Sequence, residues 1–517
     1  MIESVIANWL TKTNERNYQI PYCQVLLAKG QRVLYVSTHR PMEQGKDIIT
    51  VDNDGAYHAY QLKTGNIDQK TFRTIKGEVE ELVERSIVHP SVDKAKGHRA
   101  YLVCNGEITD EVRYLIDQMN ADNVLRDRRV AHLDIITMHG LLHDFLAAQG
   151  QFLPTTFSEL GMLLDVYNAA GTDFVPVHRV FRFFEHGLFT RVGGTKQEAR
   201  NAVAASVIST GYLLQSFQRS NNAYAVFEGW TTLAGCMIQY AYRSGLRSED
   251  WHDSLALVRT AIDAALQDLW AEVVTRTNFL EGNELVDGAE IYRARVTIML
   301  GALSAYALNT PGFDGHDRLR ALVLGNRRYL WLWGESAFPY LFSIIKYLEH
   351  AGEHHAGIEL LTVILQGTAN AFANPAAREL APPYYSAERI LRAMVNDELD
   401  ELESSGGSFI LRPILHMLAR RTARDRIATH WKQVSKVPVR EVRTTDTMDL
   451  FSWRMAQATN VTEILPRTQS WAALQQEANQ PSIALDALAE YRHILHYFIL
   501  VCPHRATPDV MRVLDSL

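Results

Sequence analysis

Cysteine is scarce in this chain. The 517 residues contain four cysteines, which lie far apart and form no C-x-x-C pair: Cys23, Cys104, Cys236 and Cys502. This spacing argues against a disulfide framework and against a zinc knuckle, and it fits a reducing compartment such as the cytosol.

Long uncharged apolar runs are also missing. The two longest candidates, residues 224–242 and 329–347, are interrupted by Glu228, and by Glu335 and Lys346. A membrane-spanning helix needs roughly 18 or more apolar residues. The first residues contain Glu3 and have no apolar core of the length found in a signal peptide. We expect a soluble, cytoplasmic protein that has no membrane partner.

Positive charge is not in excess, because the formal net charge is −7. The whole protein is therefore no polycation that coats nucleic acid, and any nucleic-acid surface must be a local patch. The chain also lacks the G-x-x-x-x-G-K-[ST] and G-x-G-x-x-G patterns of nucleotide sites. If the protein needs ATP, a separate partner, such as an ATPase, must supply that function.

The first 150 residues alternate between strand and helix patterns. Strands are predicted at 32–37, 47–51, 56–63, 99–105 and 132–138, and helices at 14–29, 68–87, 107–119 and 140–148. The Asn53-Asp54-Gly55 triplet predicts a tight hairpin turn. This order predicts an α/β domain with a mixed central sheet flanked by helices.

Beyond residue 151 the sequence predicts a large all-α region. Helices are expected at 197–219, 223–242, 251–276, 288–308, 318–333, 340–350, 358–372 and 487–501. The acidic segment 397–407 ends in Ser and Gly residues and is expected to be an exposed connector. We therefore predict three parts, at 1–150, 151–395 and 408–517.

The first hairpin carries polar residues that suit phosphodiester hydrolysis. This reaction needs a metal held by oxygen ligands, an activated water and a cation near the developing charge. Asp47 opens one strand, and Gln61 and Lys63 share a face of its partner because side chains two apart point the same way. Asp47 and the amide oxygen of Gln61 are candidate metal ligands, and Lys63 is the candidate cation.

This arrangement resembles the PD-(D/E)xK nuclease superfamily, and more narrowly its Mrr-like restriction-endonuclease branch. The resemblance rests on Gly45-Lys46-Asp47, on Gln61-Leu62-Lys63 as a Q-x-K motif, and on the order of elements over roughly the first 150 residues. Residues 99–113 and 132–142 are similar to the later strands and helices of the family. The family also has an acidic residue on its first helix. Glu15 is preferred for that place and Glu3 competes with it.

The resemblance implies a Mg²⁺- or Mn²⁺-dependent endonuclease that cleaves DNA. Asp47, Gln61 and Glu15 would hold the metal, and Glu43 is a possible further ligand. Such domains joined to helical regions resemble bacterial restriction or antiphage effectors, and cutting both strands favours a homo-oligomer. Two alternatives stay open: a scaffold or sensor that binds nucleic acid without cutting it, and a nuclease of DNA repair or junction resolution.

One basic run, at 411–443, is a second candidate for nucleic-acid contact. Arg420, Arg424 and, within reach, Arg421 are expected to share a helical face, which could neutralise phosphates. The same residues could instead be a solvated face paired with the acidic segment 397–403. Lys46, beside Asp47, is a further candidate for contact with nucleic acid.

Overall fold

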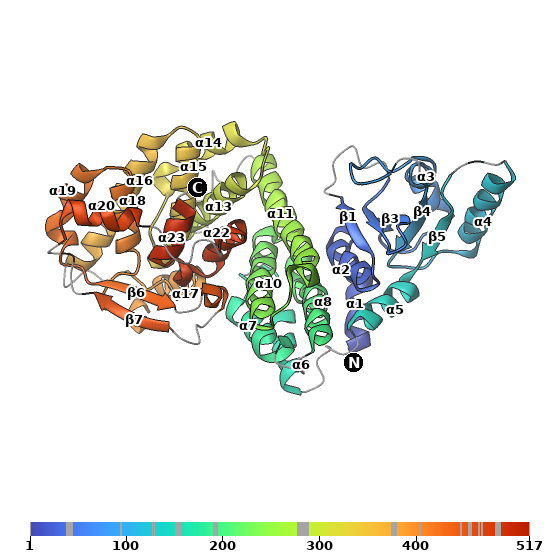
Figure 1. Ribbon diagram of the computed structural model, residues 1–517, viewed down its shortest axis with the longest axis horizontal. Helices are drawn as coiled ribbons and strands as arrows, with labels where there is room; N and C mark the ends of the chain where they lie inside the picture. Colours follow the sequence, from blue (N-terminus) through green and yellow to red (C-terminus); the bar gives the residue numbers. More distant parts are fainter. Residues whose placement is uncertain are drawn as a thin grey trace. The chain divides into compact units, whose positions relative to one another are not determined.

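The computed structural model forms two compact units, Met1–Ala264 and Ala265–Leu517, which are drawn in Figure 1 and described separately. The predicted limits near residues 150 and 395–408 do not coincide with this division and stay predictions about domains. The described residues are 2–37, 45–93, 96–126, 128, 130–149, 157–172, 174–189, 195–276, 289–373, 380–396, 398–403, 405–444, 447–452, 458–463, 466, 469–480 and 488–515.

The first unit contains the predicted mixed sheet and a set of helices. Its elements are α1 (Ile2–Lys12), α2 (Glu15–Ala28), β1 (Arg32–Val36), β2 (Ile48–Val51), β3 (Tyr57–Lys63), α3 (Gln69–Glu84), β4 (His98–Cys104), α4 (Asp110–Leu125), β5 (Leu133–Ile136), α5 (Met138–Gln149), α6 (Phe157–Tyr167), α7 (Val177–Arg182), α8 (Lys196–Leu213), α9 (Gln215–Arg219), α10 (Ala223–Arg243) and the first part of α11 (His252–Thr275).

The sheet has the order β1-β2-β3-β4-β5. The first three strands are antiparallel, and β3, β4 and β5 run parallel to one another, so the prediction of a mixed sheet is confirmed. The predicted tight turn joins β2 to β3. Gly55 has a φ of +77°, and the Asp52 carboxylate accepts hydrogen bonds from the backbone of Asp54 and Ala56.

Helices cover both faces of this sheet (Figure 1). On one face, Ala59 of β3 and Leu102 of β4 form a core with Phe72 and Val79 of α3 and with Ile116 of α4. On the other face, α2 and α5 contact the strands. Because successive strand residues alternate between the faces, Gln61 and Lys63 point to the α3 side, as Ala59 does.

Helix α2 lies between the sheet and α8, and it is buried from Tyr18 through Leu26. Pro21 of α2 fits against Gly211 of α8, where an added Cβ would come within 2.7 Å of the proline ring. Trp9 of α1 packs edge-on against Tyr212, with 4.7 Å between the ring centroids. The helices that follow the sheet therefore share a core with the sheet's own helices.

A buried amide ties the end of β4 to the loops beside it. Asn105 Nδ2 donates to the carbonyl oxygens of Leu10 and Thr13, at 2.6 and 2.9 Å, and Asn105 Oδ1 accepts from Gly65 N at 2.6 Å.

Asn105→Ala leaves these buried groups unpaired, and we expect it to lower the free energy of unfolding by about 2–4 kcal/mol. Urea unfolding measures this. Asn66→Ala, which removes one exposed bond to Glu107 N, should cost less than about 1 kcal/mol. An equal loss of unfolding free energy in the two variants would contradict this stabilising role of the Asn105 hydrogen bonds.

The second unit is mainly helical, as predicted. Its elements are the rest of α11, α13 (Ala289–Asn309), α14 (His316–Gly325), α15 (Phe338–His350), α16 (His354–Ala373), α17 (Ala387–Val395), α18 (Leu411–Arg420), α19 (Arg424–Val434), β6 (Val439–Thr444), β7 (Ala458–Glu463), α20 (Trp471–Asn479), α22 (Arg492–Val501) and α23 (Pro508–Asp515).

Two expectations for this region are wrong. The region is not all-α, because β6 and β7 pair as a two-stranded antiparallel sheet. The helix expected at 318–333 ends at Gly325 and is followed by a short 3-10 turn at Arg327–Tyr329.

Among the described residues, one helix, α16, is long and apolar enough by length and composition to cross a membrane. In the second unit it packs against α15, α18 and α19. A helix that packs within a soluble protein can pass the same length and composition test.

Candidate active site

The β2–β3 hairpin brings the predicted motif residues together. Asp47, just before β2, donates its backbone N–H to the Tyr60 carbonyl at 2.8 Å. Its Oδ2 atom accepts a hydrogen bond from Leu62 N at 2.6 Å. Leu62 lies between Gln61 and Lys63, so the Asp47 carboxylate is held beside the Q-x-K segment.

A residue of α3 contacts both polar side chains of this motif. Glu78 Oε2 lies 2.7 Å from Lys63 Nζ and accepts a hydrogen bond of 3.3 Å from Gln61 Nε2. The Lys63 side chain is 14% exposed and that of Glu78 51%. Glu78 is exposed on α3 and reaches the site from its rim. Its position across the sheet face from Lys63 depends on tertiary packing, and no motif in the sequence marked it.

The oxygen of the Gln61 amide, in contrast to its NH₂ group, contacts no polar partner in the described structure. Gln61 is 5% exposed, and its Oε1 atom has no hydrogen-bond partner among the described residues. Gly45, with φ of +69°, passes next to it. A Cβ at this position would lie 3.3 Å from Gln61 Oε1 and 2.5 Å from the Glu78 carbonyl oxygen. Only a residue without a side chain fits here.

Glu15 lies at the same end of β3. It stands in the first turn of α2, and its Oε1 atom accepts from Thr64 N at 3.1 Å, directly after the strand. Tyr18, one turn further, donates its hydroxyl to the Lys63 carbonyl at 3.0 Å. Burial and the nearby charges of Glu15 and Asp47 raise the pKa of Tyr18. Both carboxylates therefore lie near this phenol, whereas Glu3 is exposed on α1.

The donor set fits a small, hard divalent cation. Asp47 and Glu15 provide carboxylate oxygens, and Gln61 provides a buried amide oxygen that lacks a partner in the described structure. No group of three His, Cys, Asp or Glu side chains suited to a metal occurs in the part of the chain that the structure describes. With Asp47 and Glu15, the Gln61 amide oxygen is the third candidate ligand. Glu43, the possible further ligand, lies outside the described residues.

Lys46 takes a different place from the expected one. It is 2% exposed, and its Nζ donates to the Glu81 carbonyl on α3 at 3.2 Å. Burial lowers the pKa of Lys46 to about 8. We therefore do not place Lys46 in a nucleic-acid interface, because its amino group is directed into the protein.

The arginines of the basic run are also arranged differently. Arg420 ends α18 and Arg424 begins α19, and Thr422 between them has a left-handed φ of 54°. The expectation that they share one helical face is wrong. Arg424 is exposed.

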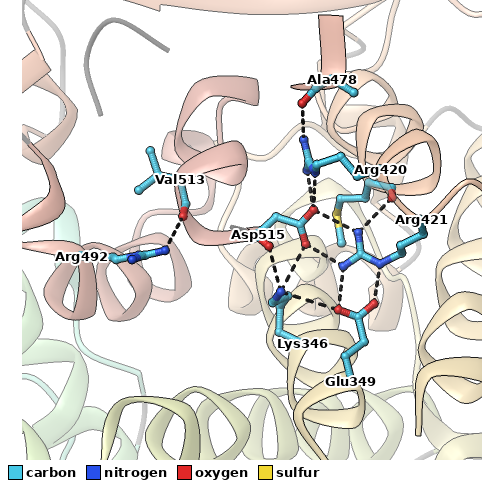
Figure 2. A network of polar contacts seen from close by, with 9 residues as sticks. Lys346, Glu349, Arg420, Arg421, Ala478, Arg492, Val513 and Asp515 are labelled. Carbon is cyan, nitrogen blue, oxygen red and sulfur yellow. Dashed lines mark hydrogen bonds and ion pairs between the residues drawn. The ribbon is translucent and has the colours of Figure 1, made fainter. Parts of the chain in front are cut away.

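Arg420 and Arg421 belong to a partly buried ionic cluster around the buried Asp515 in the second unit (Figure 2). Arg420 Nε donates to Asp515 Oδ2 at 2.6 Å, and Arg421 Nη2 donates to Asp515 Oδ1 at 2.6 Å. Arg421 also pairs with Glu349, and Lys346 Nζ donates to the Asp515 carbonyl at 2.9 Å. For these two arginines the structure therefore favours ion pairing within the protein over contact with phosphates. Their partners are Asp515 and Glu349 and not the expected acidic segment 397–403.

Comparison of this chain with models of protein families, with curated proteins and with solved structures found no match.

Proposed function

We propose that the chain is a metal-dependent endonuclease that hydrolyses phosphodiester bonds of DNA. The observation that carries this proposal is the convergence of Glu15, Asp47, Gln61 and Lys63 at one end of β3, from separate parts of the sequence. Two acids, an amide oxygen and a lysine at one place are the groups that this hydrolysis requires.

Each residue of the candidate site has a role in the proposed reaction that follows from its contacts. Bound Mg²⁺ or Mn²⁺, held by Asp47, Gln61 and Glu15, would supply Lewis-acid activation of water and charge neutralisation at the phosphate. Asp47 is fixed by Leu62 N, so its carboxylate is oriented before substrate arrives. Lys63 provides a cation for the charge that develops on the phosphate oxygens. The Tyr18 hydroxyl holds the Lys63 backbone at its carbonyl.

The proposed setting follows the resemblance described above. We propose a cytoplasmic restriction or antiphage effector that acts as a homo-oligomer on duplex DNA, with a separate ATPase as a candidate partner. One observation favours a second candidate, a scaffold that binds DNA without cutting it. Gln61 is neutral where the family usually has an acid, and Lys63 is paired with Glu78.

Cleavage assays with linear, supercoiled and branched duplex DNA test the proposal. We expect cutting in Mg²⁺ or Mn²⁺, none in EDTA, and loss of cutting by about a hundredfold or more in Asp47→Asn. Asparagine keeps an oxygen that can accept from Leu62 N, so the hairpin should remain folded. Asp54→Asn, in the exposed turn of the same hairpin, is the control and should cut normally.

The outcomes separate the candidates. Cutting that persists in EDTA or in Asp47→Asn contradicts the proposed site. Tight DNA binding without cutting in any metal favours the scaffold. A preference for branched over linear duplex favours a junction-resolving nuclease.

A further inference from the structure

Glu78 makes an unusual double contact in the candidate site. One carboxylate oxygen, Oε2, is shared by Gln61 Nε2 at 3.3 Å and Lys63 Nζ at 2.7 Å. Glu78 comes from α3, whose buried side chains Ile75, Val79 and Leu82 fix the helix on the sheet. The carboxylate is thus presented to the Q-x-K strand by a packed helix and not by a loop.

The contact has a chemical consequence that is particular to glutamine. An amide side chain has a donating end and an accepting end, and a rotation of 180° exchanges them. A carboxylate only accepts, so it binds the NH₂ end and would repel the carbonyl end. The Glu78 contact therefore fixes the NH₂ end of the amide, and Gln61 Oε1 takes the opposite end, beside Gly45, where it is buried without a partner among the described residues.

We propose that Glu78 is a positioning residue that orients the Gln61 amide so that its oxygen, and not its NH₂ group, is presented to the metal. This inference rests on the proposed function. It assigns Glu78 no direct contact with the metal or the DNA. It also explains how a neutral glutamine can serve where an acid, which presents oxygen at both ends, would need no such orientation.

A simpler explanation is that Glu78 only balances the charge of Lys63. Half-exposed ion pairs contribute little to stability, and their loss changes long-range electrostatics by a small amount. Such a role would not depend on whether the side chain at position 61 has distinguishable ends. The two explanations therefore predict different effects of Glu78→Ala in the native chain and in a chain that carries Gln61→Glu.

The test is a double-mutant cycle on Mn²⁺ affinity, measured by isothermal titration calorimetry of the full chain without DNA. We expect Glu78→Ala to weaken Mn²⁺ binding by about 10- to 100-fold, the range found when groups that orient metal ligands are removed. In the Gln61→Glu background, Glu78→Ala should not weaken the affinity, because either carboxylate oxygen of residue 61 can face the metal and the repulsion between the carboxylates at positions 61 and 78 is relieved. Glu80→Ala removes an exposed acid of the same helix, paired with Lys76, and should leave the affinity unchanged.

Each result decides the question, and thermal unfolding of all variants confirms that they fold. Equal losses for Glu78→Ala in both backgrounds, or no loss in either, would overturn the positioning role while the nuclease proposal stands. A wild-type chain that neither binds Mn²⁺ nor cuts DNA would overturn both proposals together.

Discussion

Lys63→Met is expected to reduce DNA cleavage by about a hundred- to a thousandfold, the loss that follows removal of one group that stabilises transition-state charge. Methionine keeps the length and the apolar stem of the side chain, which is 14% exposed. The hydrogen bond from Tyr18 goes to the backbone carbonyl of Lys63 and is retained. Single-turnover cleavage with saturating Mg²⁺ measures the chemical step.

The control for this change is Lys76→Met on α3. Lys76 is 61% exposed and pairs with Glu80 one turn away, so its removal alters the net charge equally without touching the site. We expect its cleavage rate to remain within about twofold of wild type. A Lys63→Met protein that cuts as fast as the control would limit Lys63 to a structural ion pair with Glu78.

Asp515→Asn is expected to destabilise the second unit by about 3–5 kcal/mol, the usual cost of breaking a buried ion pair on one side. The Asp515 side chain is 2% exposed and faces Lys346, Arg420 and Arg421. Without its charge, these cations are left with Glu349 as the remaining carboxylate of the cluster in Figure 2. Urea unfolding measures the loss.

The pH dependence of this effect gives a second measurement. Burial alone would raise the pKa of Asp515, but hydrogen bonds and charges of Arg421, with Arg420 and Lys346, hold it at about 2. An unfolded aspartate has a pKa of about 3.9. The stabilisation is therefore fully present above about pH 4 and is lost as the pH falls toward 2. The difference in unfolding free energy between wild type and Asp515→Asn should therefore become smaller between about pH 4 and pH 2.

Asp509→Asn is the matched control on the same helix. Asp509 is 59% exposed and lies 3.7 Å from Arg512, and such surface pairs contribute less than about 1 kcal/mol. If Asp515→Asn costs no more than this control, or if its cost does not depend on pH, the cluster does not hold α23 in the way its geometry indicates.

The sheet and its hairpin could be predicted because their signals are local. Short runs of β-branched and aromatic residues mark β1 to β5, and Asn53-Asp54-Gly55 marks the turn that places Asp47 beside Gln61 and Lys63. The coarse division into a mixed sheet followed by a helical remainder is confirmed. These features depend on neighbours within a few residues along the chain.

The features that prediction missed depend on residues distant in sequence. Glu78 meets Lys63 only because α3 folds back over the sheet, and Asp515 meets Arg421 across 94 positions of the chain. Charge alone could not distinguish an exposed arginine such as Arg424 from a partly buried, ion-paired one such as Arg421. The basic composition of the run 411–443 gives no sign of strand β6, because pairing with β7 decides the local structure there.

The position of α2 has a practical consequence for dissecting the protein. This helix carries Glu15 and Tyr18 at one end, and further along it Pro21 packs against Gly211 of α8. A fragment that stops at residue 150 would uncover the α8 side of a helix that is buried from Tyr18 through Leu26. The smallest fragment that keeps this helix covered extends through α8 to Leu213, so the sheet and the helices after it should be expressed, purified and crystallised together.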